Sequence, residues 1–275
     1  MSHNSTGRGA HSGLLIMGAF VLMVEISLSR AKKPDMVIPS VQILGLPVHN
    51  VDMASTLSAI RGFTGTGTPH HIVTADASML VMAQEDAELR GIIANADLVT
   101  PDSIGVLWAA GRKKTPLRER VSGVEIAERL CAESAAQAYR IYFLGAGPGV
   151  AAAAAEKMRA KYPSVAIVGA RDGYFSLAET REVVAEIRAS EANILLVAMG
   201  IPKQEKWIQA HREALGCSVL IGVGGTLDVL SGQVKRAPRI MQALRLEWLW
   251  RVLSNPSKLS KVMLLPRFVR MVTAR

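Results

Sequence analysis

Cysteine is scarce in this chain, which holds only Cys131 and Cys217 among its 275 residues. Two cysteines so far apart have neither the density of a disulfide framework nor the spacing of a metal-binding pair. The six histidines form no HExxH or similar cluster either. We therefore expect buried thiols in a reducing compartment and no metal site.

A long apolar run is also missing. The run Leu14–Val24 near the amino end has 11 residues, whereas a helix that spans a bilayer needs about 20. With Arg8 before it and Ser27-Leu-Ser29 after it, this run resembles a weak signal peptide. The other interpretation is that translation begins at Met36, just before the first convincing strand. Residues 1–36 are treated as an amino-terminal extension on which no function is based.

Acidic residues are almost absent from the carboxyl end. Residues 235–275 hold ten Lys or Arg and one acid, Glu247, so this segment carries the whole formal net charge of +9. Trp248 and Trp250 lie between these charges, among aliphatic residues. This pattern is typical of an amphipathic element on an anionic membrane surface. A solvated helix face would carry fewer large apolar residues, and no recognised motif supports the other alternative, nucleic-acid binding.

The rest of the chain alternates short strand-like runs with helical patterns. A strand pair, or a strand and turn, is expected within residues 37–48, and further strands at 71–74, 97–100, 140–144, 165–169, 194–199 and 219–223. Helices are expected at 52–61, 78–84, 89–94, 104–110, 119–137 (beginning near 122), 150–161, 178–190 and 203–214. This order predicts an α/β core over residues 37–234, with a mainly parallel sheet and helices on both faces.

One carboxylate stands where the chain turns from strand to helix, in the stretch TPDSIG. Asp102 follows Thr100 and Pro101 and precedes a helical pattern. An aspartate in this place is a favoured helix N-cap. The carboxyl ends of parallel strands are also where open α/β folds build their sites. Asp102 is therefore either a cap or a functional group.

A glycine-rich turn, FLGAGPGV, follows the strand at 140–144. Gly145, Gly147 and Gly149 would let a phosphate approach the backbone, where the amino end of the next helix offers free N–H groups. The turn is not a Walker loop, since no Lys-Ser/Thr follows, and it is not a full dinucleotide fingerprint. Tight packing of helix on strand explains the same glycines.

The turn GIPKQEKW follows the strand at 194–199. Lys203 is suited to face a phosphate, and Gln204 and Glu205 to bond sugar hydroxyls or a uracil edge, with Gly200 opening the turn. The alternative is an ordinary helix start with a glutamate near its positive end. Three polar types at one strand end favour a functional interpretation.

Two further turns complete this edge of the sheet. GVGGTLD follows a strand, and its Gly224 and Gly225 suit close approach of a ligand to the backbone. Thr226 or Asp228 is a candidate cap of the next helix. RDGYF, which contains Tyr174, follows another strand, and its alternative interpretation is a plain turn.

Together these motifs resemble the WecG/TagA/CpsF glycosyltransferases over about residues 41–268. The motifs that carry the resemblance occur in the family's order: TPDSIGVLWAA, RVSGVEI, FLGAGPGVAAAAAEKM, RDGYF, GIPKQEKWI, and GVGGTLDVLSGQVKRAP with LEWLWR. The resemblance implies a Rossmann-like core and a carboxyl-terminal helical appendage, residues 235–275, that covers the site at the inner face of the cell membrane.

The activity that the resemblance implies is transfer of a sugar from a UDP-sugar to a polyprenyl-diphosphate-linked saccharide in cell-surface polysaccharide synthesis. The transfer would proceed with inversion and without metal or cofactor, in a cytoplasmic, peripheral membrane enzyme that is expected to form homo-oligomers. The donor sugar would be N-acetylmannosamine, its uronic acid, or a hexose such as glucose.

The resemblance also implies roles for matching residues. Asp102 would be the general base that takes the proton from the acceptor hydroxyl as this oxygen attacks the anomeric carbon. The cleft would contain Thr74, Arg120 and Gln204, and the nucleotide side the loop 145–149 and Tyr174. The acceptor diphosphate would be bound by Arg251, Lys258 and Lys261. The two lysines attract a phosphate as point charges and lack the bidentate grip of arginine.

Two residues depart from the pattern of the family. The family commonly has Thr-x-Asn where this chain has Thr74-Ala-Asp76, so Asp76 replaces the asparagine. Its added carboxylate is expected to alter the choice of sugar or to perturb Asp102, the neighbouring base. Ser103 stands where glycine is common, and it is expected to narrow the pocket while the turn stays feasible.

Two other functions remain open on the sequence alone. An NAD(P)-dependent oxidoreductase would carry GxGxxG after the first strand and an acid about twenty residues later, and the loop at Gly145 offers neither cleanly. A non-catalytic membrane-binding protein would use the basic segment, with Asp102 only a cap. Binding of UDP in a calorimeter would separate the transferase from both.

Overall fold

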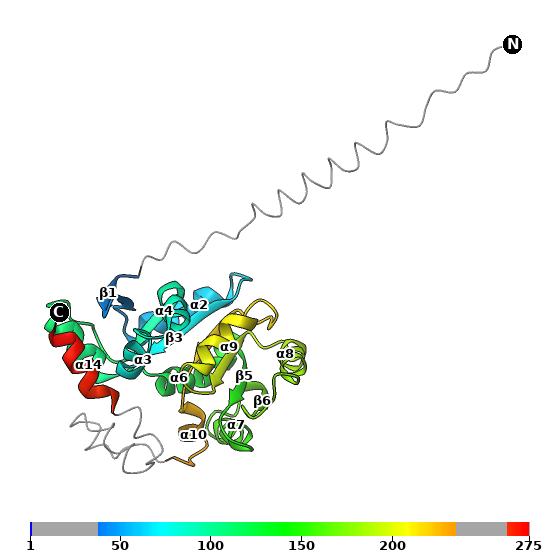
Figure 1. Cartoon of the computed structure of the whole chain (residues 1–275). Helices are drawn as coiled ribbons and strands as arrows, with labels where there is room; N and C mark the ends of the chain where they lie inside the picture. Colours follow the sequence, from blue (N-terminus) through cyan, green and yellow to red (C-terminus); the bar gives the residue numbers. More distant parts are fainter. Residues whose placement is uncertain (2–37, 235–262, 275) are drawn as a thin grey trace. The chain divides into compact units, whose positions relative to one another are not determined.

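A computed structural model describes Met1 and residues 38–234 and 263–274 (Figure 1). Apart from Met1, the described elements belong to the unit Val37–Arg275. The signal-like run and the three residues assigned to the acceptor diphosphate, Arg251, Lys258 and Lys261, lie outside the described residues.

A six-stranded parallel sheet is the centre of this unit. Its strands lie in the order β4-β3-β8-β7-β5-β6, and every neighbouring pair is parallel. The bounds are β3 (His70–Ala75), β4 (Leu98–Pro101), β5 (Arg140–Gly145), β6 (Ala166–Arg171), β7 (Ile194–Ala198) and β8 (Val219–Gly222). The predicted parallel α/β core is thus confirmed.

An antiparallel hairpin precedes the sheet and protects one of its edges. It is formed by β1 (Ser40–Ile43) and β2 (Leu46–His49), so the strand pair is confirmed. The backbone N–H of Val99, in the edge strand β4, donates to His49 Nδ1 at 2.9 Å. The His49 side chain therefore accepts a backbone N–H of the edge strand that would otherwise be available to pair with a strand of another chain.

Helices cover both faces of the sheet, because successive strand side chains point to opposite sides. One face is covered by α2 (Met53–Thr64), α6 (Gly123–Gln137), α7 (Val150–Lys161) and α10 (Thr226–Leu230). The other is covered by α3 (Ala77–Met82), α4 (Ala87–Asn95), α5 (Ile104–Arg112), α8 (Thr180–Ala189), α9 (Lys203–His211) and α14 (Leu264–Thr273). Helices on both faces are as predicted.

Some element bounds differ from the prediction. Gly145 was expected in a turn but is the last residue of β5, because it still pairs with Ala198 of β7. The helix expected to run to residue 214 ends at His211, where Ala214 and Leu215 turn back to bond its carbonyl oxygen. These ends depend on contacts with other elements, which local patterns do not reveal.

The carboxyl-terminal helix α14 packs on α3, as Figure 1 shows. Phe268 is 1% and Val272 7% exposed, and both belong to the apolar cluster that includes α3 and α5. Arg267 forms an ion pair with Glu85. An amphipathic carboxyl-terminal helix is confirmed, and Phe268 and Val272 on its apolar side pack into the core. The membrane-facing role predicted for residues 235–275 remains a prediction.

Candidate functional site

The carboxyl ends of all six strands meet at one edge of the sheet, since the strands are parallel. Along the chain β5 is followed by its neighbour β6 on one side, whereas β7 is followed by β8 on the other. The crevice between β5 and β7 is therefore a topological switch point, where open α/β sheets bind ligands. The motifs singled out in the sequence lie on both sides of this point.

Asp102 lies at the end of β4 and is partly buried. Its backbone N–H donates to the Ala75 carbonyl at 3.0 Å, which extends the β3–β4 ladder beyond the pair Ala75–Pro101. Asp76 and Asp102 thus directly follow the ends of two neighbouring strands, β3 and β4, which lie about 4.8 Å apart. The N-cap of α5 is Ser103, so the capping position that was considered for Asp102 belongs to the next residue.

Asp76 caps α3. Its Oδ1 accepts hydrogen bonds from the Met79 N–H and the Ser78 hydroxyl, both at 2.7 Å. This capping role was not predicted from the sequence. Asparagine caps a helix as well as aspartate does, so capping does not account for the charge that this chain places beside Asp102.

Arg120 approaches the same turn through its backbone. The N–H of Val121 donates to the Pro101 carbonyl at 2.9 Å, which holds this segment against the end of β4. The guanidinium of Arg120 lies 3.2 Å from Glu125, which in turn accepts the hydroxyl of Ser122, the predicted start of α6. The structure therefore places Arg120 and Asp102 together at the carboxyl end of β4.

Thr74 is buried and links β3 to its neighbour β8. Its hydroxyl donates to the Gly222 carbonyl at 2.8 Å, from β3 to β8. This bond commits the hydroxyl proton to the protein. Contact of Thr74 with a substrate remains a prediction.

Gln204 joins the turns that follow β7 and β8. Its Oε1 accepts the N–H groups of Gly200 at 3.1 Å and Gly224 at 3.0 Å, and its Nε2 donates to Glu205 at 2.7 Å. Gln204 is 1% exposed and Glu205 is also buried. The bonds of Gln204 hold the two turns together, and contact of Gln204 or Glu205 with a sugar or a uracil edge remains a prediction.

The glycines of these turns have different roles. Gly145 has φ +120°, and an added Cβ would lie 2.5 Å from the backbone of Ala198, so close packing of β5 on β7 requires this glycine. Gly149, the N-cap of α7, has φ +76° and open space around it. At Gly147 an added Cβ would meet only Val150, at 3.5 Å. Gly145 is therefore required by contact between two strands, not by the packing of helix on strand that was considered, whereas Gly147 and Gly149 leave room for a ligand.

The turn after β8 differs from the prediction in the residue that caps the next helix. α10 begins at Thr226, and its N-cap is Gly225, without a side-chain capping bond. The Thr226 hydroxyl instead donates back to the Val223 carbonyl at 2.6 Å. Neither Thr226 nor Asp228 is the N-cap, while Gly224, with φ +57°, makes the turn as its position suggests.

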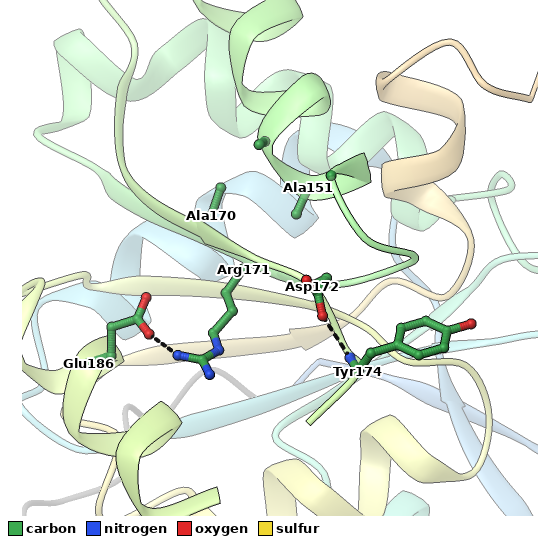
Figure 2. Close-up of a pocket in the computed structure, with 8 residues that line it drawn as sticks. Ala151, Ala170, Arg171, Asp172, Tyr174 and Glu186 are labelled. Atoms are coloured by element: carbon green, nitrogen blue, oxygen red, sulfur yellow. Dashed lines mark hydrogen bonds and ion pairs between the residues drawn. The ribbon is translucent and has the colours of Figure 1, made fainter. Parts of the chain in front are cut away.

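A pocket of about 370 Å³ opens beyond the glycine turn, between α7, the end of β6 and α8 (Figure 2). Its lining consists of Gly149, Ala151, Ala152, Ala170, Arg171, Asp172, Tyr174 and Glu186. Tyr174 is 77% exposed, and its backbone N–H donates to Asp172 at 2.9 Å. In Figure 2 the Tyr174 ring extends away from Arg171. Tyr174 thus lines the same pocket as Gly149 of the glycine turn.

Arg171 and Glu186 were missed in the sequence. Arg171 forms an ion pair with Glu186, which also accepts the hydroxyl of the buried Tyr142. Burial, together with this carboxylate, raises the pKa of the Tyr142 phenol. RDGYF contained the signal for Arg171, but Glu186 lies in α8, which no motif marked.

Lys203 connects the turns that follow β7 and β6. Its Nζ donates to the Gly173 carbonyl at 3.4 Å and lies 5.8 Å from the centre of the Phe175 ring. Gly173 in turn donates to the Ala146 carbonyl at 3.1 Å. The cation predicted to face a phosphate is thus placed at the switch point, beside the glycine turn.

The turn that contains Asp102 and the glycine turn are far apart. Four strand-to-strand steps separate β4 from β5, which at about 4.8 Å a step is about 19 Å. A ligand that reaches both turns must be extended, with one end beside Asp102 and the other beside Tyr174.

The two cysteines are buried and free, as expected, and burial raises the pKa of each thiol to about 12. Within residues 38–234 and 263–274, no group of three or more His, Cys, Asp or Glu side chains is placed to hold a metal ion. In the same part of the chain, no helix has the length and apolar character to cross a membrane.

The family model of the glycosyl transferase WecG/TagA/CpsF family matches residues 41–275. The match includes every strand of the parallel sheet and all of the turns described above. It supports the glycosyltransferase over the two alternatives that the sequence left open, the oxidoreductase and the non-catalytic membrane-binding protein. The chain therefore belongs to the WecG/TagA/CpsF family of glycosyltransferases, enzymes of cell-surface polysaccharide synthesis.

Proposed function

We propose that this chain transfers a sugar from a UDP-sugar to a polyprenyl-diphosphate-linked saccharide, with inversion at the anomeric carbon and without a metal ion. The donor would carry N-acetylmannosamine, its uronic acid, or a hexose such as glucose. The observation that supports this most directly is the pair of turns about 19 Å apart, with a carboxylate at one and glycines and Lys203 at the other.

The chemical step is a single displacement with Asp102 as general base. Asp102 takes the proton of the acceptor hydroxyl while the oxygen forms its bond to the anomeric carbon. The bond from that carbon to the diphosphate breaks, and UDP leaves with its electron pair. One displacement inverts the configuration. A base must be held rigidly for this step, which the backbone bond between Asp102 and Ala75 provides.

The donor would lie along the edge from the nucleotide side towards Asp102. Gly147 and Gly149 leave the backbone accessible at the start of α7, where N–H groups and the helix dipole favour a phosphate. Lys203 adds a positive charge at the same place. Tyr174 offers an exposed ring for the uracil. Gln204, Gly200 and Gly224 shape the floor between the two ends.

The acceptor would come from the membrane, with its diphosphate bound by Arg251, Lys258 and Lys261. The basic, tryptophan-containing segment supports peripheral binding at the inner face of the membrane. Because α14 is packed into the core, the part proposed to meet the bilayer narrows to residues 235–262.

The test is an assay of purified protein with membrane extract and a panel of radiolabelled UDP-sugars, followed by NMR of the anomeric proton in the product. Transfer of one sugar to a lipid-linked product of opposite anomeric configuration is expected. Asp102→Asn should bind UDP as wild type does but lose turnover by about 10²–10⁴-fold. Wild-type turnover in this variant would remove Asp102 as the base, and a retained configuration would remove the single displacement.

A further inference from the structure

Ser103 has the backbone of a helix N-cap but caps a different helix. It precedes α5 with φ −128° and ψ 151°, the extended conformation from which a serine usually bonds its own helix. No side-chain capping bond to α5 is formed. Its Oγ instead accepts the N–H of Ala77, the first residue of α3, at 3.2 Å.

This is the second of two hydrogen bonds, called ties here, that join the segment around Asp76 to the segment around Asp102. On one side the Asp102 N–H donates to the Ala75 carbonyl at 3.0 Å, and on the other Ala77 donates to Ser103. Asp76 lies between Ala75 and Ala77, and Asp102 immediately precedes Ser103. The two ties therefore fix the backbone of Asp102 relative to that of Asp76.

Packing around the tie is close. A Cβ added at Gly105, in the first turn of α5, would lie 3.3 Å from the Ala77 Cβ and 3.7 Å from Phe268 of α14. The helices α3, α5 and α14 thus meet beside Ser103. A shift of α5 away from α3 would move Asp102, because Asp102 is joined directly to the start of α5.

We propose that Ser103 is a positioning residue, whose hydroxyl links α5 to α3 and so holds the Asp102 carboxylate in place against the acceptor hydroxyl. The proposal rests on the proposed function of Asp102 as the base. It predicts that the loss of one oxygen atom affects turnover rather than donor binding.

The experiment compares Ser103→Ala and Ser103→Thr in the full-length protein. The alanine removes the acceptor oxygen, and the threonine keeps it at a position that tolerates Thr. Ser103→Ala should lower kcat by about tenfold or more, since small displacements of a catalytic group are costly, while KM for the UDP-sugar and the Kd for UDP stay at wild-type values. Ser103→Thr should restore kcat.

Ser134→Ala is the matched control. The Ser134 hydroxyl also accepts a backbone N–H from another element, that of Ala166 at 2.9 Å, but at the start of β6, the opposite edge of the sheet. The Ser134 hydroxyl also donates to the Tyr139 carbonyl at 2.8 Å, so Ser134→Ala should cost at least as much stability as Ser103→Ala without lowering kcat. All variants are assayed well below their midpoints of thermal unfolding, and Ser103→Gly replaces Ser103→Ala if the alanine variant does not fold.

The outcomes separate this proposal from the proposed function. An inactive Asp102→Asn together with wild-type kcat in Ser103→Ala would overturn the role of Ser103 and leave the base in place. Equal losses in Ser103→Ala and Ser103→Thr would also overturn it, since the hydroxyl would not be the cause. Full activity of Asp102→Asn would overturn the proposed base itself.

Discussion

Replacement of Phe268 by alanine distinguishes a carboxyl-terminal helix that belongs to the core from one that serves the membrane. Phe268 is 1% exposed, packs beside Gly105, and lies 6.4 Å from the Trp108 ring, centre to centre. Truncation of a fully buried phenylalanine costs about 3–5 kcal/mol, because the lost transfer energy is joined by the energy of a cavity. For a domain of this size that is a fall of about 6–20 °C in Tm, at about 2–4 °C per kcal/mol.

The assay is chemical and thermal unfolding of wild type, Phe268→Ala and Val269→Ala, with sedimentation of each protein on vesicles that contain anionic lipid. Val269 is the neighbouring residue and is 44% exposed, so its truncation should change the free energy of unfolding by about 0.5 kcal/mol or less. Phe268→Ala should be strongly destabilised and should still sediment with vesicles at a temperature at which it is folded. A variant with wild-type Tm and lost vesicle binding would refute the packing of α14 into the core.

Four further outcomes are expected. Burial, with Arg212 nearby, lowers the pKa of His71 to about 4. The contribution of His71 to the free energy of unfolding should therefore be fully present above pH 6.5 and fall by about 3 kcal/mol towards pH 4, and His71→Phe should lose this part of the pH dependence in urea unfolding. Gly145→Ala should unfold or lose UDP binding in calorimetry, because its Cβ would lie 2.5 Å from the Ala198 backbone, whereas Gly91→Ala, whose Cβ would meet nothing within 4 Å, should bind UDP. Activity should survive EDTA, and complete inhibition reversed by Mn²⁺ would contradict the metal-free mechanism. Combined replacement of Arg251, Lys258 and Lys261 by Ala should abolish transfer to a lipid-linked acceptor while vesicle binding falls only modestly.

Local signals explain why so much of the fold could be predicted from the sequence. Buried strands are short runs of β-branched residues, and Gly, Pro and Asp mark their ends. Asp86 separates α3 from α4 as the N-cap of α4, and Ser122, near which a helix was predicted to begin, is the N-cap of α6. Such residues act on their own backbone neighbours, so their effect is visible in the sequence.

The contacts within the site depend on which strands are neighbours in the sheet, and the sequence did not predict these contacts. Gln204 bonds Gly224 because β7 lies beside β8, and Ser103 bonds Ala77 because β4 lies beside β3. Glu186 meets Arg171 across two elements with no shared motif. A polar residue at a strand end has equal reason to bind a ligand or an adjacent turn, and only the strand order decides between them.

The position of α14 changes how the acceptor side can be studied. The segment 235–262 follows α10, whose end is fixed by the bond from the Val234 N–H to the Asp228 carbonyl at 3.0 Å, and it precedes a helix anchored by Phe268. It is therefore joined to the core at both ends. Deletion from residue 240 onward would remove the basic residues and also uncover the apolar cluster around Phe268, so lost transfer would not show a lost membrane contact. Substitutions of charge within 235–262 leave α14 in place, and they can separate binding of the acceptor from stability of the core.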